Sequence, residues 1–235
     1  MTERRRLLLM RHGAVDYFDA QGRPYPPDDV PLTSQGIAQA RAVGAALAAD
    51  GIRIDRALTS GLARTRETAQ QVIEAARLAL SIEHWSDLQE IRGGRLSAIR
   101  DDDLRDAFIA AFEGPVPPET RFLGGETIGE LTDRVLPALQ RLLADSGWDT
   151  ALLVAHGGVN RAVLSWFLTG RHQFLGGLAQ DAGCLNVIDV GATPATSVVR
   201  VVNFCPLDTL RTETRLSTME ELLHKYLKLR ARSEA

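Results

Sequence analysis

A short apolar segment that ends in His-Gly occurs twice in this chain, and this repeat constrains the fold more than any other feature. Residues 7–10 precede Arg11-His12-Gly13, and residues 151–155 precede His156-Gly157. A run of four or five apolar residues between polar ones is typical of a buried strand. Open α/β sheets bind ligands at the carboxyl ends of their strands, so we expect both imidazoles to face one crevice.

Strand-like and helix-like segments alternate along the chain. Apolar spacing predicts helices over residues 33–51, 61–76, 104–112, 126–144, 159–168 and 219–229. Strands are predicted over residues 7–10, 54–59, 80–84 and 150–155, followed by a hairpin of residues 184–190 and 197–203. Pro137 falls inside the apolar stripe of one helix, so we expect a kink or a shifted boundary there.

This alternation predicts an α/β protein with three layers, α/β/α, around a mostly parallel mixed central sheet. The late hairpin adds at least one antiparallel strand. We expect a single domain over residues 1–235, with loop or helical elaborations around residues 17–31 and 92–127.

Composition limits the class of partner. The 235 residues include 27 Lys and Arg against 30 Asp and Glu, a formal net charge of −3, which argues against binding of nucleic acid. The apolar runs fall far short of the roughly 20 residues that span a bilayer, so we expect no membrane partner. Cys184 and Cys205 form no CxxC pair and are expected to be buried, reduced thiols of a cytoplasmic protein.

A cationic site is predicted where these strands end. Arg64 falls in the first turn of a helix, where a cation opposes the helix dipole unless an anion lies nearby. Arg66 points elsewhere and is expected to pair with a surface acid. The backbone of Gly157 and Gly158 could offer further donors to phosphate. The chain lacks metal-ligand spacing, a P-loop and a dinucleotide-binding turn, so we expect phosphoryl chemistry without a metal or cofactor.

A series of motifs resembles the histidine phosphatase superfamily, which includes the cofactor-dependent phosphoglycerate mutases. The resemblance covers roughly residues 7–168 and rests on six segments in the family order. They are Arg11-His12-Gly13, residues 32–40 (LTSQGIAQA), residues 60–69 (SGLARTRETA), Leu88-Gln89-Glu90, residues 124–127 (GGET) and Val154-Ala155-His156-Gly157.

The resemblance implies a phosphoglycerate mutase-like fold and a role for each matching residue. His12 is implied as the nucleophile that becomes phosphohistidine. Glu90 is implied as the group that protonates the leaving oxygen and then activates the incoming water or alcohol, and one carboxyl group can do both in a two-step transfer. Arg11, Arg64 and His156 are implied to hold the phosphoryl oxygens.

The chain departs from the family pattern at two places, which leaves the substrate open. The family's Asn after Arg-His-Gly has no counterpart near Phe18, and the segment after Glu90 lacks the Trp-Glu-Gly of common phosphatases. Asp at positions 101–103 does not favour a second phosphate or carboxylate nearby. We therefore expect a phosphomonoester hydrolase. The alternative is a phosphoglycerate mutase-type transfer, and a non-catalytic phospholigand-binding domain is a third reading.

The expected substrate is a small-molecule phosphomonoester, although a phosphoprotein fits the same chemistry. Exposed strand edges would permit a homodimer. Three arginines close to the motifs are hypothesised to recognise a charged substrate: Arg92, Arg95 and Arg161. The other histidines are expected to be structural or exposed: His84, His172 and His224.

Overall fold

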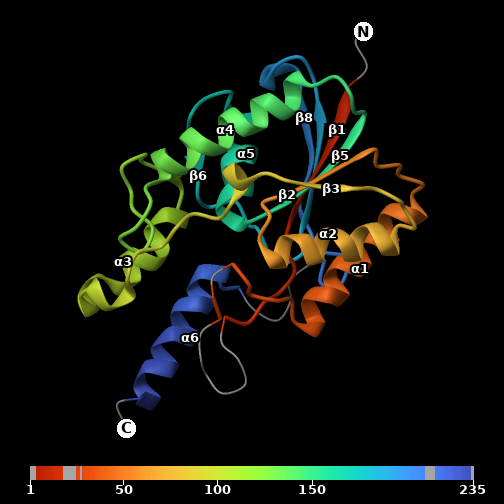
Figure 1. The fold of residues 1–235 in the computed structure, drawn as a ribbon. Helices are drawn as coiled ribbons and strands as arrows, with labels where there is room; N and C mark the ends of the chain where they lie inside the picture. Colours follow the sequence, from red (N-terminus) through yellow and green to blue (C-terminus); the bar gives the residue numbers. More distant parts are fainter. Residues whose placement is uncertain (1–3, 18–24, 27, 210–214, 234–235) are drawn as a thin grey trace.

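The computed structural model describes residues 4–17, 25–26, 28–209 and 215–233 (Figure 1). The expected loop over residues 17–31 therefore lies largely outside the described residues, as does Phe18. The strands are β1 (Arg5–Arg11), β2 (Arg56–Thr59), β3 (Ile82–His84), β4 (Pro115–Val116), β5 (Thr150–Ala155), β6 (Phe174–Leu175), β7 (Leu185–Val190) and β8 (Val198–Phe204). The α-helices are α1 (Ser34–Ala49), α2 (Ala63–Ala75), α3 (Leu104–Ile109), α4 (Ile128–Ala144), α5 (Gly157–Thr169) and α6 (Thr218–Ser233).

The described residues form a six-stranded mixed sheet in the order β3-β2-β5-β1-β7-β8. Neighbouring strands from β3 to β1 are parallel, whereas β7 is antiparallel to both β1 and β8. Only β7 therefore runs against the others in this sheet, which confirms the mostly parallel mixed α/β architecture. A separate short ladder joins β4 to β6.

Alternate residues of the central strands face opposite layers, which explains why these strands are apolar throughout. Leu7 and Leu9 of β1 belong to the core cluster that α4 and α5 complete. Leu8 and Met10 belong to the cluster that α1 and α2 complete. Figure 1 shows α1 and α2 on one side of the sheet, with α4 and α5 on the other.

Local sequence signals set the helix boundaries. The Thr33 side chain accepts a hydrogen bond from Gly36 N–H and begins α1. Thr127 and Glu130 form a reciprocal capping box at the start of α4. Helix α4 continues through Pro137, so of the two expected outcomes the shifted boundary is wrong and the kink stays a prediction. The neighbours of Pro137 on either side are buried, and this packing outweighs the backbone hydrogen bond that proline cannot make.

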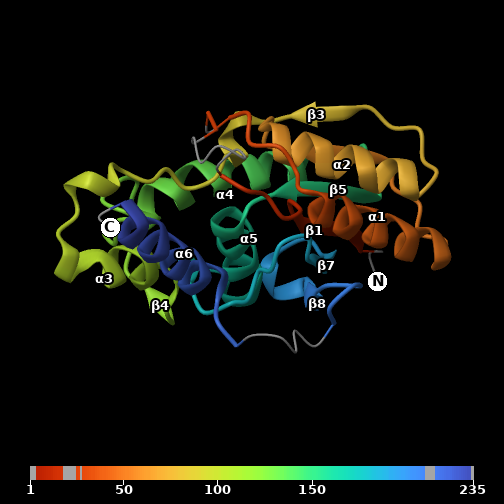
Figure 2. The ribbon, with the colours of Figure 1, turned by 90° about the horizontal axis from the view of Figure 1, so that it is seen from below.

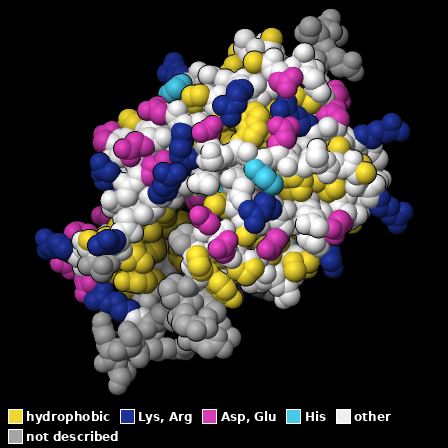
Figure 3. Space-filling model, in the orientation of Figure 1, with side chains coloured by type: hydrophobic (Ala, Val, Ile, Leu, Met, Phe, Trp, Pro, Cys, Tyr) yellow, Lys and Arg dark blue, Asp and Glu magenta, His cyan; other side chains and the backbone are white. Residues whose placement is uncertain are grey.

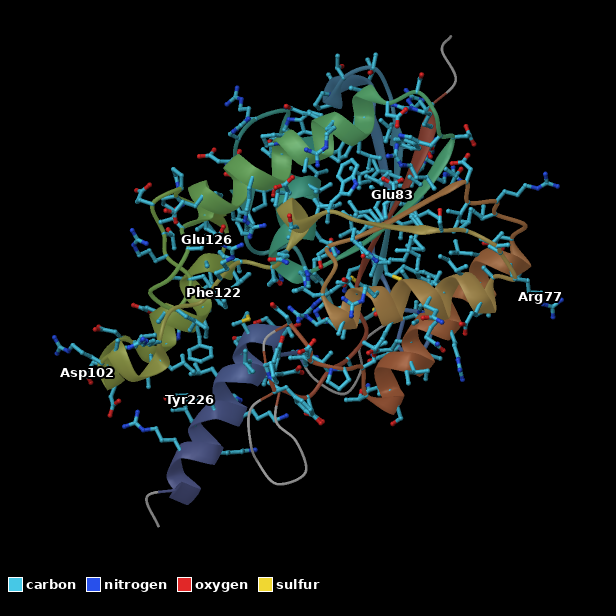
Figure 4. The ribbon with its side chains drawn as sticks, viewed as in Figure 1. Arg77, Glu83, Asp102, Phe122, Glu126 and Tyr226 are labelled. Carbon is cyan, nitrogen blue, oxygen red and sulfur yellow. The ribbon has the colours of Figure 1, made fainter. Side chains whose placement is uncertain are left out.

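Helices α3 and α6 pack together beyond the ends of the strands (Figure 2). Phe108 of α3 and Tyr226 of α6 have ring centroids 5.7 Å apart. Arg230 extends α6 past its expected end and donates two hydrogen bonds to Asp101 at 2.6 and 2.9 Å. Figure 3 shows hydrophobic side chains gathered between α3 and α6, and Figure 4 labels Tyr226 on α6. We call this pair of helices the α3–α6 cap.

The cysteines differ from the expectation in one respect. Cys184 is buried, and burial raises the pKa of its thiol to about 12. Cys205 is only half-buried, because it follows edge strand β8 rather than lying within the sheet. Neither forms a disulfide. A search of the described helices finds none with the length and apolarity to cross a membrane.

Two glycines let α1 approach the end of β1. A Cβ on Gly13 would lie under 3.0 Å from the backbone of Gly36, and a Cβ on Gly36 would lie under 3.0 Å from the backbone of Ala14. The backbone after His12 is thus held directly against the first turn of α1.

We predict that Gly36→Ala destabilises the protein by about 1–3 kcal/mol, because the added methyl group overpacks a backbone contact. In a helix without this contact, alanine would stabilise the protein by about 0.5–1 kcal/mol relative to glycine. A lower free energy of unfolding in Gly36→Ala would therefore indicate the close backbone contact. Urea unfolding followed by circular dichroism measures the change. Gln35→Ala, at an exposed position in the same turn, is the control and is expected to stay within about 0.5 kcal/mol of wild type. Equal stability of the two variants would contradict the assigned contact.

Candidate active site

Strand register brings the two His-Gly segments together. Parallel pairing aligns Arg11 of β1 with Ala155 of β5, so the residues that follow, His12 and His156, leave the same edge of the sheet. Their ring centroids lie 5.2 Å apart with an interplanar angle of 65°. His12 is 3% exposed and His156 is fully buried. The expected meeting of the two imidazoles is therefore observed.

A backbone hydrogen bond fixes which nitrogen His12 presents. Nδ1 lies 2.8 Å from the Gly13 carbonyl oxygen, which can only accept a hydrogen bond. Nδ1 therefore carries the proton, and Nε2 of the neutral ring carries the lone pair. Burial lowers the pKa of His12 well below its ordinary value of 6.5, and the charges of Arg11 and Arg64 lower it further. The ring is thus neutral near pH 7 and nucleophilic at Nε2.

His156 lies at the head of a chain of hydroxyl groups. Its Nε2 is 2.8 Å from Ser60 Oγ, which is 3.0 Å from Thr65 Oγ1. Thr65 Oγ1 donates to the Leu62 carbonyl at 2.8 Å. Ser60 Oγ therefore donates to Thr65 Oγ1, and His156 Nε2 donates to Ser60 Oγ. Burial lowers the pKa of His156 well below its ordinary value, repulsion from His12 when that ring is protonated lowers it further, and the charges of Arg64, Arg11 and Arg134 add to the effect.

Two arginines border the histidines from different elements. Arg64 lies in the first turn of α2, as expected, and is 5% exposed. Arg11 ends β1 and donates from Nη1 to the Gln180 carbonyl and to Thr218 Oγ1, the latter at 3.1 Å. The buried Nε of Arg11 has no hydrogen-bond partner within the described part of the chain. A buried and a half-buried guanidinium group beside two neutral imidazoles make this edge of the sheet suited to a compact anion.

Glu90 reaches the same place from a loop. Its Oε1 accepts hydrogen bonds from Gly158 N at 3.1 Å and from Ile91 N at 3.0 Å, which places the carboxylate at the N-terminus of α5. A Cβ on Gly158 would lie 2.7 Å from that oxygen, so glycine is needed for the approach. The donor that Gly158 was expected to offer to phosphate is instead used by Glu90.

The remaining predicted residues have structural contacts. Arg161 is 5% exposed and donates to the carbonyls of Gly176 at 2.9 Å and Gly157 at 3.1 Å, and its burial lowers its pKa to about 10. Arg66 was expected to meet a surface acid but donates to the Gly61 carbonyl. Substrate recognition by Arg161 and by the exposed Arg92 and Arg95 stays a hypothesis.

The other histidines lie away from this contact network. His84 is exposed, and its Nδ1 is 2.8 Å from Thr59 Oγ1. His172 and His224 are exposed. Within the residues described, no group of three or more His, Cys, Asp or Glu side chains is placed to hold a metal ion.

Sequence reasoning missed three contributors to the site. Ser60 was noted only as the first letter of a motif, although its hydroxyl contacts His156. Thr218, which contacts Arg11, lies 207 residues along the chain from it and carries no local signal. Arg134 on α4 binds the loop of Glu90 and could have been suspected only from the charged pair that it forms with Glu126 of the 124–127 motif.

Comparison with known proteins identifies the family of the chain. The family model described as histidine phosphatase superfamily (branch 1) matches residues 7–203, so the chain belongs to that superfamily.

Curated relatives include a 2,3-bisphosphoglycerate-dependent phosphoglycerate mutase of Azorhizobium caulinodans, 32% identical over 170 residues, which cover 68% of this chain and 80% of the relative. A protein of the same name from Sinorhizobium fredii is 34% identical over 171 residues, which cover 67% and 77%.

Solved structures share the fold. A mycobacterial glucosyl-3-phosphoglycerate phosphatase aligns with a TM-score of 0.66 and 22% identity over 85% of this chain and 98% of its own. The alpha-ribazole phosphatase of Shigella flexneri aligns with a TM-score of 0.63 and 23% identity over 84% and 96%. At these identities the likeness establishes the α/β fold.

We predict a pH-dependent stability that follows from the lowered histidine pKa values. The native state keeps His12 and His156 neutral, whereas the unfolded chain protonates them below about pH 6.5. The unfolded state then binds more protons, so the free energy of unfolding falls as pH drops through that value. The contribution of each histidine reaches about 1.4 kcal/mol per pH unit. Urea unfolding at pH 7.5, 6.5 and 5.5 measures the slope.

The variant His12→Gln isolates one histidine. Its slope between pH 6.5 and 5.5 is expected to be smaller than that of the wild type, whatever its absolute stability. An unchanged slope would show that His12 is protonated in the native state.

Proposed function

We propose that the protein is a metal-independent phosphomonoester hydrolase that acts through a phosphohistidine intermediate on His12. One observation carries the proposal: the hydrogen bond from His12 Nδ1 to the Gly13 carbonyl leaves Nε2 with its lone pair, close to buried Arg64, half-buried Arg11 and a second buried imidazole. A neutral imidazole is a good nucleophile toward phosphorus, and guanidinium groups neutralise phosphoryl oxygens.

In the first step, His12 Nε2 attacks phosphorus and the bond from phosphorus to the leaving oxygen breaks. Arg11, Arg64 and His156 balance the charge on the non-bridging oxygens. The anion also favours protonation of His156, which would then donate from Nδ1. Glu90, in its protonated form, gives its proton to the leaving oxygen, so the alcohol departs neutral.

In the second step, a water molecule attacks the phosphohistidine. Glu90, now a carboxylate, takes a proton from that water, the bond from phosphorus to Nε2 breaks, and inorganic phosphate leaves. His12 recovers its lone pair, and Glu90 ends the cycle protonated as it began. The hydrogen bond from Gly158 N–H holds the Glu90 carboxyl group at the N-terminus of α5, two residues after His156 in the chain.

The choice between hydrolase and mutase rests on the region around the α3–α6 cap. Three aspartates at 101–103 are exposed, and Asp101 is paired with Arg230. Arg100, Arg105 and Arg230 each pair with acidic side chains, so they offer little free positive charge to the second phosphate and carboxylate of a bisphosphorylated acid, which supports hydrolysis. Relatives named phosphoglycerate mutase, 32–34% identical, support the alternative of phosphoryl transfer between positions of one substrate.

We propose that the substrate is a small-molecule phosphomonoester. We also propose that the protein acts in the cytoplasm. The proposal includes a phosphoprotein as an alternative substrate and a homodimer as the assembly, and each needs its own test.

We predict that His12→Ala lowers turnover by about 1,000-fold or more without loss of the fold, because no other described group presents a lone pair at this position. Release of inorganic phosphate from p-nitrophenyl phosphate, with chelator present, measures turnover. His172→Ala, at an exposed position, is the matched control and is expected to keep wild-type activity. Normal turnover by folded His12→Ala would contradict the assignment of His12 as the nucleophile.

A substrate panel separates hydrolase from mutase. We predict that 3-phosphoglycerate, with and without its bisphosphate, gives slow isomer conversion, whereas other small phosphomonoesters release inorganic phosphate. Product isomers and phosphate are followed together. Rapid isomer conversion with little phosphate release would identify the mutase alternative. Folded protein that binds phosphate but turns over nothing in the panel would favour the binding-domain reading.

A further inference from the structure

The guanidinium group of Arg134 binds the backbone of the loop that carries Glu90. Its Nη1 donates to the carbonyls of Asp87 at 2.8 Å and Gln89 at 2.6 Å, and its Nη2 donates to the carbonyl of Glu90 at 3.1 Å. Nε and Nη2 also donate to the two carboxylate oxygens of Glu126, at 2.7 and 2.9 Å. All five N–H donors of the guanidinium are therefore used.

Glu126 holds the same loop from its other end. The backbone N–H of Arg92 donates to Glu126 Oε2 at 2.8 Å, and Glu126 N–H donates to the Arg92 carbonyl at 2.8 Å. Burial raises the pKa of the Glu126 carboxyl, but the hydrogen bonds from Arg134 and the Arg92 backbone hold it below its ordinary range. Glu126 is thus an anion that orients the Arg134 fork, and Figure 4 shows it beside the first turn of α4.

Glu90 is consequently fixed at two points. Its main-chain carbonyl is held by α4 through Arg134, and its carboxylate is held by the backbone N–H of Gly158 at the start of α5. The α4 and α5 helices pack against each other, so the two points belong to one rigid unit.

We propose that Arg134, oriented by Glu126, is a positioning residue that sets the location of Glu90 for proton transfer. The proposal rests on the function proposed above, in which Glu90 protonates the leaving oxygen. The five guanidinium hydrogen bonds go to backbone carbonyls and to Glu126, so Arg134 would act on the reaction through the position of Glu90. It acts by drawing three backbone carbonyls toward one point, where their dipoles would otherwise repel one another.

The geometry of arginine is required for this role. A planar fork can serve three carbonyls and a carboxylate at once, whereas a lysine ammonium has only three donors that diverge from one atom. Loss of the fork lets the loop relax, and a shift of about 1 Å in a proton donor is enough to cost on the order of 100-fold in rate.

The test compares two substrates whose leaving groups differ in how much they need a proton from Glu90. An alkyl phosphate needs protonation of its alkoxide, whereas p-nitrophenyl phosphate leaves as a stable phenolate and needs little. The measure is kcat/KM, because it reports the steps up to phosphorylation of His12 and is unaffected by slow hydrolysis of the intermediate. Purified full-length protein is assayed with both substrates, and thermal unfolding is recorded for each variant.

We expect Arg134→Met to lower kcat/KM for the alkyl phosphate by about 100-fold but for p-nitrophenyl phosphate by less than about 10-fold. Arg134→Lys and Glu126→Gln keep more of the contacts and are expected to show the same selective loss to a smaller degree. They preserve the test if the methionine variant does not fold.

Arg141→Gln is the matched control. Arg141 is also on α4 and donates to the Asp87 side chain at 3.2 Å, but the pair is exposed and involves none of the three carbonyls. This variant is expected to keep the wild-type ratio between the two substrates.

The variant Glu90→Gln shows whether a negative result concerns the positioning role of Arg134 alone or the proposed role of Glu90. Selective loss on the alkyl phosphate in Glu90→Gln but equal loss on both substrates, or no loss, in the folded Arg134 and Glu126 variants would overturn the positioning role alone. Absence of selective loss in Glu90→Gln itself would overturn the proposed role of Glu90, and the inference with it.

Discussion

The parallel pairing of β1 with β5 is the constraint on which the rest of the structure depends. Its register places Arg11 opposite Ala155, and so His12 and His156 leave the sheet side by side. A shift of one residue would turn every side chain of β1 to the opposite layer, so that each core would receive the wrong face of this strand. The same apolar alternation that fills two cores therefore also sets the distance between the two imidazoles.

The site combines two kinds of buried group that would each be unfavourable alone. Buried guanidinium groups need anions or carbonyls, and buried imidazoles are stable only when neutral. Arg11 and Arg64 make protonation of His12 harder, and the loss of that proton exposes the lone pair at Nε2. Positive charge close to a neutral nucleophile is an arrangement organised for an incoming phosphoryl dianion before it arrives.

Much of this could be predicted from the sequence because the signals are local. Apolar runs of four to six residues, Thr33 and Thr127 at helix starts, and His-Gly after two strands each depend on neighbours in the chain. The outcome at Pro137 could not be predicted in this way, since burial on both sides of that residue is a property of the tertiary structure.

The contacts of Arg134 were also beyond sequence reasoning. They join α4 to a loop more than 40 residues earlier in the chain. Arg134 binds backbone carbonyls there, and every residue type has a backbone carbonyl, so the sequence gives no signal for these contacts. The exposure of Cys205 depends likewise on β8 being an edge strand, which strand order alone decides. Long-range backbone contacts are thus the part of a site that residue patterns do not encode directly.

The contact between Arg11 and Thr218 has a consequence for the order of assembly. The two residues are separated by 207 positions, so β1 meets this partner only after α6 has been synthesised. A ribosome-bound chain that ends before α6 can pair its strands and bring its histidines together, yet Arg11 still lacks one of its hydrogen bonds. Completion of the sheet edge that carries Arg11 and His12 is therefore coupled to the synthesis and docking of α6, an element distant in the sequence.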